Sequence, residues 1–281
     1  MAAHESEFSV QAMCQVLGMS RSGYYAWRNR PASQRAQANE RLRVQIREEY
    51  QLSRKTYGSP RIHAALKRKG VVCGRKRVAC LMRLDHIAAR RARRRIPHTT
   101  QKDPSAVPAP NLLNQDFSSP APDRKWVSDI TYIDTAEGWL YLAAVLDLFS
   151  RRVVGWAMAE HMETSLVQQA WNMAVLQRCP SAGLLHHSDQ GSQYTSEVYQ
   201  QSLTTHQCQI SMSRSGNCLD NAAMESFFST LKTECADEQF DNRAQARTTI
   251  FEYIEAWYNR QRLHSALGYL SPAEFECKSR H

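Results

Sequence analysis

The sequence predicts an α/β fold in which a mixed sheet flanked by helices follows a series of all-α units. Helical periodicity dominates the first part of the chain, and strand and helix patterns alternate in the last part. The charge divides in the same way, because residues 1–110 hold 23 Lys and Arg against 7 Asp and Glu, whereas residues 111–281 hold 13 against 20. We therefore expect a basic module that meets a polyanion, joined to an acidic module.

The composition excludes several classes of protein. No apolar run approaches the roughly 20 residues that a membrane-spanning helix needs, so no membrane partner is expected. The first residues, MAAHESEFSV, lack the basic flank and apolar core of a secretory signal. The 8 cysteines form no CxxC pair, which favours reduced thiols over a disulfide framework or a zinc site. These features predict a cytoplasmic protein.

Residues 1–87 are interpreted as a helical DNA-binding region that contains helix-turn-helix units. Ser9 is expected to cap a helix that ends near Leu17, and Ser20 is expected to cap a second helix that runs toward Trp27. Two short helices joined by a glycine-containing turn are typical of this motif.

A second pair of helices repeats the pattern more clearly. Ser59 is expected to cap a helix with Pro60 at its first position, and a turn bounded by Gly70 and Gly74 precedes the next helix. The start of the second helix of such a motif lies in the major groove. The expected DNA contacts there are Arg75, Lys76 and Arg77. A helical hairpin with a solvated basic face is the alternative, but two such units in one basic segment favour DNA binding.

Residues 88–123 are interpreted as a basic, proline-rich linker. They hold 6 of the 10 prolines, which cannot continue helices or central strands. The run RRARRR is either solvated or in contact with a DNA backbone, and its position after two helix-turn-helix units favours DNA. The expected contacts are Arg90, Arg91, Arg93, Arg94 and Arg95.

Residues 124–281 are predicted to form the α/β domain. Three strands joined by short turns predict an antiparallel meander, and the helices and strands that alternate after it complete a mixed sheet. The expected strands are 126–134, 139–147, 153–159, 184–188 and 209–212, and the expected helices are 164–177, 196–206, 221–235 and 243–259.

Three carboxylates stand at positions where they can converge. Asp129 lies in the middle of the first strand, Asp189 ends a later strand and precedes a glycine turn, and Glu225 lies early in a helix. Taken singly, each has a structural reading as a cap, a turn residue or a surface acid. Together, with no Cys or His ligand, they suit hard divalent ions, above all Mg²⁺. Two such ions can promote attack on a phosphodiester.

Several neighbouring residues receive smaller roles. Lys232 follows Glu225 by seven positions, on nearly the same helix face, and is expected to contact phosphate. Asp220 and Asn221 are expected to cap the same helix. His186 and His187, which point to opposite faces of a strand, are interpreted either as structural residues or as residues that support the metal ligands.

Four segments of the chain closely resemble successive blocks of the orfB-type transposases of the insertion-sequence-three family. They are WVSDITYIDTAEGWLYLAAVLDLFSRRVVGW, HHSDQGSQYTS, SMSRSGNCLDNAAMESFFSTLKTE and YNRQRLHSALGYLSPAEFE. YGSPRIHAALKRKG resembles the upstream helix-turn-helix of that family, and AMCQVLGMSRSGYYAW its N-terminal block. The resemblance implies a ribonuclease-H-like integrase catalytic core, with Asp129, Asp189 and Glu225 as catalytic triad and metal ligands.

The implied activity is DNA transposition. The resemblance implies strand cleavage by water and strand transfer by a 3′-hydroxyl, with two Mg²⁺ ions for which Mn²⁺ can substitute. It also implies a homo-multimer on the element ends and target DNA in the bacterial cytoplasm, associated with the nucleoid. In this family the active enzyme usually carries an upstream segment, so the upstream orfA product or a fusion with it is an expected partner.

Three alternatives remain open. A nuclease of the same fold would cut DNA without joining it, and a DNA-binding regulator would have an inert catalytic half. A tyrosine recombinase would use Tyr269 with nearby arginines and a covalent intermediate, although the Gly268 turn around it favours a structural segment.

Overall fold

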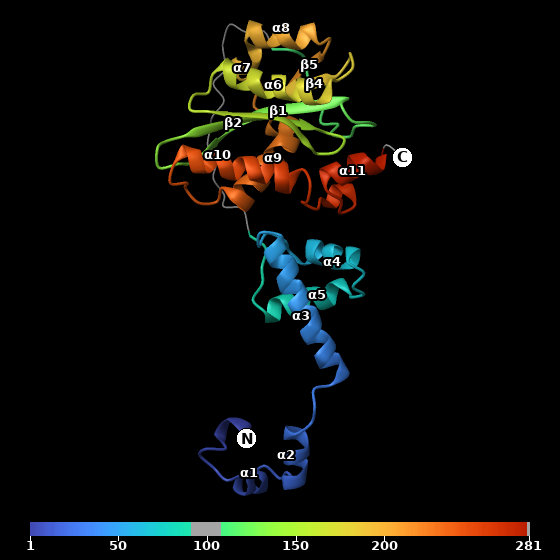
Figure 1. The fold of residues 1–281 in the computed structure, drawn as a ribbon, viewed down its shortest axis with the longest axis vertical. Helices are drawn as coiled ribbons and strands as arrows, with labels where there is room; N and C mark the ends of the chain where they lie inside the picture. Colours follow the sequence, from blue (N-terminus) through green and yellow to red (C-terminus); the bar gives the residue numbers. More distant parts are fainter. Residues whose placement is uncertain (91–107, 280–281) are drawn as a thin grey trace.

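The computed structural model describes residues 1–90 and 108–279. A series of helices leads from the N-terminus to a layered α/β domain (Figure 1). The predicted α/β class with preceding all-α units is confirmed. No helix in the described part of the chain is both long and apolar enough to cross a membrane.

The first helices begin where the sequence predicts them. After a short turn of 3₁₀ helix at Ala2–His4, α1 spans Val10–Val16 and α2 spans Arg21–Arg28. The Ser9 hydroxyl accepts a hydrogen bond from the Ala12 N–H at 3.2 Å, and Ser20 accepts one from Gly23 at 3.0 Å. Both serines therefore satisfy N–H groups that the first turn leaves open.

Three further helices form a small bundle: α3 (Gln34–Leu52), α4 (Ser59–Arg68) and α5 (Arg75–Leu84). α3, the longest helix of the chain's described part, was not predicted from the sequence, because the surface of this helix is almost wholly polar. The N-cap of α4 is Gly58, so the predicted Ser59 cap is wrong, and Pro60 occupies the second helical position. Apolar side chains of all three helices meet in one buried cluster, which includes Leu42, Ile46, Ile62, Leu66, Val78 and Leu81.

The bundle contacts the α/β domain through the loop before α4 and through α4 itself. The Tyr57 hydroxyl accepts a hydrogen bond from the Leu263 N–H at 2.7 Å, and the Arg61 Nε donates to the Leu263 carbonyl at 3.0 Å. The Tyr57 ring lies 5.8 Å from the Trp257 ring, centroid to centroid. The hydrophobic cluster of the bundle therefore continues into the core below the sheet.

Five strands form one mixed sheet with the order β3-β2-β1-β4-β5. β1, β2 and β3 are antiparallel, whereas β4 and β5 run parallel to β1. Each strand starts and ends within one residue of its predicted position. Their bounds are Lys125–Ile133, Leu140–Asp147, Val153–Ala159, Leu185–Ser188 and Gln209–Met212.

Helices cover both faces of the sheet (Figure 1). α6 (Thr164–Arg178) and α8 (Glu197–Thr205) pack on one face, and α9 (Ala222–Cys235) and α10 (Arg243–Glu252) pack on the other. The predicted helix 243–259 is interrupted, because α10 continues as a π-helical segment, Tyr253–Tyr258. The remaining short helices are α7 (Ser192–Thr195), 3₁₀ turns at Cys218–Asn221 and Ser265–Leu267, and α11 (Pro272–Ser279).

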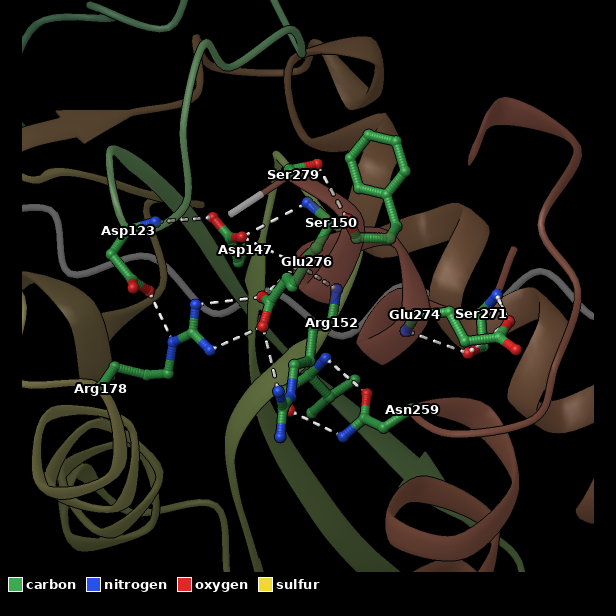
Figure 2. Close-up of polar contacts among 12 residues, drawn as sticks. Asp123, Asp147, Ser150, Arg152, Arg178, Asn259, Ser271, Glu274, Glu276 and Ser279 are labelled. Carbon is green, nitrogen blue, oxygen red and sulfur yellow. Dashed lines mark hydrogen bonds and ion pairs between the residues drawn. The ribbon is translucent and has the colours of Figure 1, made fainter. Parts of the chain in front are cut away.

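A buried polar network joins α11 to the end of β2 (Figure 2). The Glu276 carboxylate accepts hydrogen bonds from Arg178 at 2.9 and 3.0 Å and from Arg152 at 3.0 Å. The Ser150 hydroxyl lies 2.8 Å from Glu276 Oε1 and 2.9 Å from Asp147 Oδ2. A hydroxyl has one proton and can donate to only one of them. Glu276 is held charged by its arginines, so below about pH 6 a proton on Asp147 can complete the network.

The pKa of Asp147 agrees with this reading. Burial, followed by the negative charges of Asp123 and Glu276, raises it to about 6, against hydrogen bonds from Ser150 that lower it. Asp147 therefore acts as a structural acid at the strand end, and it is protonated more easily than an ordinary aspartate.

One glycine allows α6 to lie against β3. A Cβ atom on Gly155 would come within 2.7 Å of both the Cβ and the backbone nitrogen of Ala174. We expect Gly155→Ala to lower the free energy of unfolding by about 1–3 kcal/mol or more, because the helix backbone cannot yield like a flexible side chain. Urea unfolding would measure this. Gly74→Ala, at a position with open space, is the matched control, and equal losses for both variants would contradict the argument.

Stability should depend on the proton of Asp147. The folded-state pKa lies above the ordinary value of 3.8, so this stabilisation is complete below about pH 4 and is lost as pH rises through 6. Asp147→Asn places an N–H donor toward Ser150 at every pH. The free energy of unfolding of the variant, relative to that of the original protein, should therefore rise by roughly 3 kcal/mol between pH 4 and 7. Urea unfolding across this range measures the difference, and parallel profiles would contradict it.

Candidate active site

The register of two parallel strands brings two of the predicted acids together. Val127 of β1 pairs with His187 of β4, and two residues further along each chain stand Asp129 and Asp189. Asp189 directly follows the last residue of β4, so this equal offset brings the two residues close together at the end of the paired segment, and the charge of Asp189 acts on Asp129. Parallel strands lie about 4.8 Å apart, so the two side chains are neighbours.

Glu225 approaches this pair from the first turn of α9, which packs against β1. Burial raises the pKa of Asp129 well above its ordinary range, and the negative charges of Asp189 and Glu225 raise it further. All three predicted carboxylates thus lie within electrostatic range of one another. Among the residues that the structure describes, however, no three acidic, His or Cys side chains already stand in ligating positions for one metal ion.

Backbone groups hold the two aspartates in place. The Asp129 Oδ1 accepts a hydrogen bond from the Ile130 N–H at 2.8 Å, and the Asp189 Oδ1 accepts one from the Gly191 N–H at 2.9 Å. A small pocket opens between them, and its lining includes Met162, Gln193 and Tyr194. Oxygen donors in a repelling, partly buried pair fit a hard divalent cation, whose charge would remove the repulsion.

Tyr194 is a site residue that the sequence analysis missed. Its side chain is buried, and burial together with the charges of Tyr199, Asp129 and Asp189 raises its pKa well above the ordinary range. The neutral phenol therefore lies beside both carboxylates. Its position in the GSQY segment, just after Asp189 and its turn, was the available signal.

Lys232 lies close enough to the acids to act on them. Its ammonium group stands over the Tyr132 ring of β1, 4.1 Å from the centroid, and its positive charge opposes the rise in the pKa of Asp129. The helix spacing thus places a cation beside the carboxylates, as the sequence suggested.

The chain is similar to several known proteins and protein families. Integrase core domain models match residues 119–218 and 206–272, and an HTH-like domain model matches residues 37–95. The transposase InsF of insertion sequence IS3A from Escherichia coli (strain K12) is 42% identical over 279 residues, 98% of this chain and 96% of that protein. The uncharacterized 31 kDa protein of insertion element IS600 from Shigella sonnei is 45% identical over 267 residues, 95% of this chain and 98% of that protein.

The chain belongs to the transposases of the insertion-sequence-three family. It is a DNA transposase of the DDE type, a phosphoryl-transfer enzyme, and the expected ribonuclease-H-like core is confirmed. Among solved structures, a chain of the simian T-cell lymphotropic virus intasome aligns with a TM-score of 0.47 and 17% identity, over 76% of this chain and 69% of that chain.

The loop before α9 departs from the prediction. Asn221 occupies the N-cap position of α9, as predicted, but neither Asp220 nor Asn221 caps the helix of the transposase through its side chain. Asp220 is instead fully buried and accepts hydrogen bonds from Arg214, at 2.8 to 2.9 Å, and from Asn111 and Gln115, both at 2.9 Å. These donors, led by Arg214, hold its pKa below the ordinary range against the effect of burial. Asp220 thus anchors the loop that delivers Glu225.

The two histidines before Asp189 are structural, which is one of the two roles predicted for them. The His186 Nε2 lies 2.8 Å from the Ser128 hydroxyl, and the His187 Nδ1 lies 2.8 Å from the Ser211 hydroxyl. Burial lowers the pKa of His186 to about 3 and that of His187 to about 4, so both rings are neutral near pH 7.

The predicted DNA contacts of the helical region are only partly exposed. Arg75 and Lys76 are exposed at the start of α5, and Arg90 is exposed after it. Arg77 is half-buried, and its Nε donates to Asn39 Oδ1 of α3 at 2.8 Å, which gives it a structural role. The other arginines of the basic run, Arg91, Arg93, Arg94 and Arg95, lie outside the described residues.

Gly191 leaves room for the Asp189 carboxylate. An added Cβ would lie 3.0 Å from Asp189 Oδ1 and 3.1 Å from Gln193 Oε1, at a φ of −62° that alanine tolerates. We expect Gly191→Ala to displace the carboxylate and lower Mg²⁺-dependent DNA cleavage about 10–100-fold. The free energy of unfolding should change by about 1 kcal/mol or less. Ser192→Ala, one residue later, is the control, and full cleavage by Gly191→Ala would contradict this role.

Proposed function

We propose that Asp129, Asp189 and Glu225 of this transposase together hold divalent metal ions. The preferred ions are two Mg²⁺, for which Mn²⁺ can substitute. The observation that carries the proposal is the register of β1 and β4, which sets two repelling carboxylates side by side. When bound, the ions would supply the positive charge that activates an attacking oxygen and stabilises the leaving oxygen of a phosphodiester. The reactions would be strand cleavage by water and strand transfer by the 3′-hydroxyl so released.

The residues of the chain divide this work. The backbone N–H of Gly191 orients Asp189, and the rigid strand β1 fixes Asp129. Glu225 is exposed on α9 and would complete the ligand set through a small movement of its flexible side chain. Lys232, on the same side of α9, would bind a phosphate oxygen of the DNA beside the acids.

A tyrosine nucleophile has less support. Tyr269 lies in a turn with a φ of 61° and packs against the hydrophobic core. The neighbouring Arg262 is buried and pairs with Glu234, with its Nη2 2.7 Å from Oε1, so it is engaged inside the protein. We therefore infer that transposition proceeds without a covalent protein–DNA intermediate.

The assembly on DNA is part of the same proposal. Joining two element ends to one target in a single event requires at least two catalytic cores, so we propose a homo-multimer on DNA. The helical region would hold the ends through Arg75, Lys76 and Arg90, with Arg91, Arg93, Arg94 and Arg95 added from the basic run. The upstream orfA product, separate or fused, is the proposed further partner, and the bacterial nucleoid is the proposed location.

A strand-transfer assay with the DNA ends of the element tests the triad. We expect Asp129→Asn, Asp189→Asn and Glu225→Gln each to lower joining by at least about a hundredfold, because each removes a metal-binding charge worth several kcal/mol. All should still bind DNA in the absence of metal. Glu197→Gln, an exposed acid on α8, is the matched control.

The same assay separates the alternatives. Cut DNA without joined product would identify a nuclease, and DNA binding without any effect of Mg²⁺ or Mn²⁺ would identify a regulator. Wild-type joining by Asp189→Asn or Glu225→Gln would overturn the triad. Loss of joining in Tyr269→Phe, with a covalent complex in the original protein, would support the tyrosine mechanism.

A further inference from the structure

A second pocket, of about 360 Å³, lies on a different face of α9 from Glu225. Separate parts of the chain line it, and its polar lining comes from α4 through Arg61, the β2–β3 turn through Arg151, α9 through Ser226 and Thr230, and the segment after the π-helix through Arg262 and His264. None of these residues belongs to the carboxylate site. Arg61 comes from the bundle, so the pocket lies where the helical bundle meets the catalytic core.

Two half-buried arginines give this pocket a positive charge. The Arg61 Nε donates to the Leu263 carbonyl at 3.0 Å, and the Arg151 Nη2 donates to the Phe117 carbonyl at 3.2 Å. These bonds fix both guanidinium groups, and among the described residues most of their N–H donors have no hydrogen-bond partner. Within residues 1–90 and 108–279, neither group lies within ion-pair distance of a carboxylate.

The other titratable groups around the pocket do not cancel this charge. Glu234 is buried and pairs with Arg262 through both of its oxygens, so the pair is neutral as a unit. Burial, together with the charges of Arg262, Arg61 and Arg151, lowers the pKa of His264 to about 3 and leaves its ring neutral. Asp147 acts on Arg151 only at longer range, and the buried Tyr258 hydroxyl is neutral.

Burial of these two guanidinium groups costs solvation free energy, which a bound anion would offset. Burial lowers the pKa of both Arg61 and Arg151, which means that each charge is poorly solvated where it stands. A bound anion restores the lost interaction. Ser226 and Thr230 add two hydroxyl donors one helical turn apart on α9, both lining the same pocket.

We propose that this pocket binds a backbone phosphate of the DNA substrate, at the junction between the helical bundle and the catalytic core. Planar guanidinium forks and hydroxyl donors match the oxygens of a phosphate group. Ser226 directly follows Glu225 on α9, so a strand that passes the carboxylate site can continue over the helix into the pocket. The bound phosphate would tie α4 to α9 and hold the bundle against the core.

DNA affinity measured in EDTA tests the proposal without any need for cleavage. The full-length protein is titrated against a labelled duplex of arbitrary sequence at several KCl concentrations. We expect Arg61→Gln/Arg151→Gln to weaken binding about tenfold or more and to reduce the slope of log K against log[KCl] by about one, the value for one lost phosphate contact. Arg124→Gln removes a charge from an exposed position outside the pocket and should leave the slope unchanged.

Inorganic phosphate is the second probe. At equal ionic strength it should raise the urea midpoint of the original protein and of Arg124→Gln, but not that of the double variant. The single variants Arg61→Gln and Arg151→Gln change different elements, so a folding defect in one leaves the other as a test. Unchanged DNA affinity and slope in all three pocket variants would overturn the proposal, whether or not inorganic phosphate binds. Because metal is absent, this failure is distinct from failure of the carboxylate triad.

Discussion

The register between β1 and β4 is the constraint on which the active site depends, because it fixes the distance between two negative charges through the backbone. Hydrogen bonds between the strands hold Val127 level with His187. Asp129 and Asp189 each follow two residues later along their own segment of the chain. Neither strand can slip by one residue without sending its buried side chains to the wrong face. The repulsion between the carboxylates is therefore fixed at the end of the paired strands, and the divalent cation proposed above would relieve it.

The sequence was sufficient for the sheet and for the acids that it positions. Short apolar segments bounded by turn residues set each strand within one residue, and Asp129 stood out as an acid among core residues. α3 could not be found in the same way. Its 19 residues bury only Leu42, Ile46 and Glu49, so no apolar stripe marks it, and packing against α4 and α5 stabilises it instead.

The rest of the site depended on contacts between distant parts of the chain. A local rule assigned Asp220 to a helix cap, but Asn111 and Gln115, about 100 residues earlier, compete for its carboxylate and bury it. Arg61 and Arg151 likewise have no shared motif, since only the packing of α4 beside the β2–β3 turn brings them together. Spacing along a sequence predicts which residues share a face of one helix or strand. It carries no information about contacts between distant parts of the chain.

Each of three faces of α9 lies against a different part of the protein. Met224, Phe227 and Leu231 pack in the core, Glu225 and Lys232 face the carboxylate site, and Ser226 and Thr230 face the second pocket. A hydrogen-bonded helix moves as one body, so a group that holds one face also fixes the others. Contact between the helical bundle and the catalytic core can therefore affect the position of Glu225, because both involve the same rigid helix, α9. In this transposase, the proposed phosphate pocket and the proposed metal site therefore share one helix.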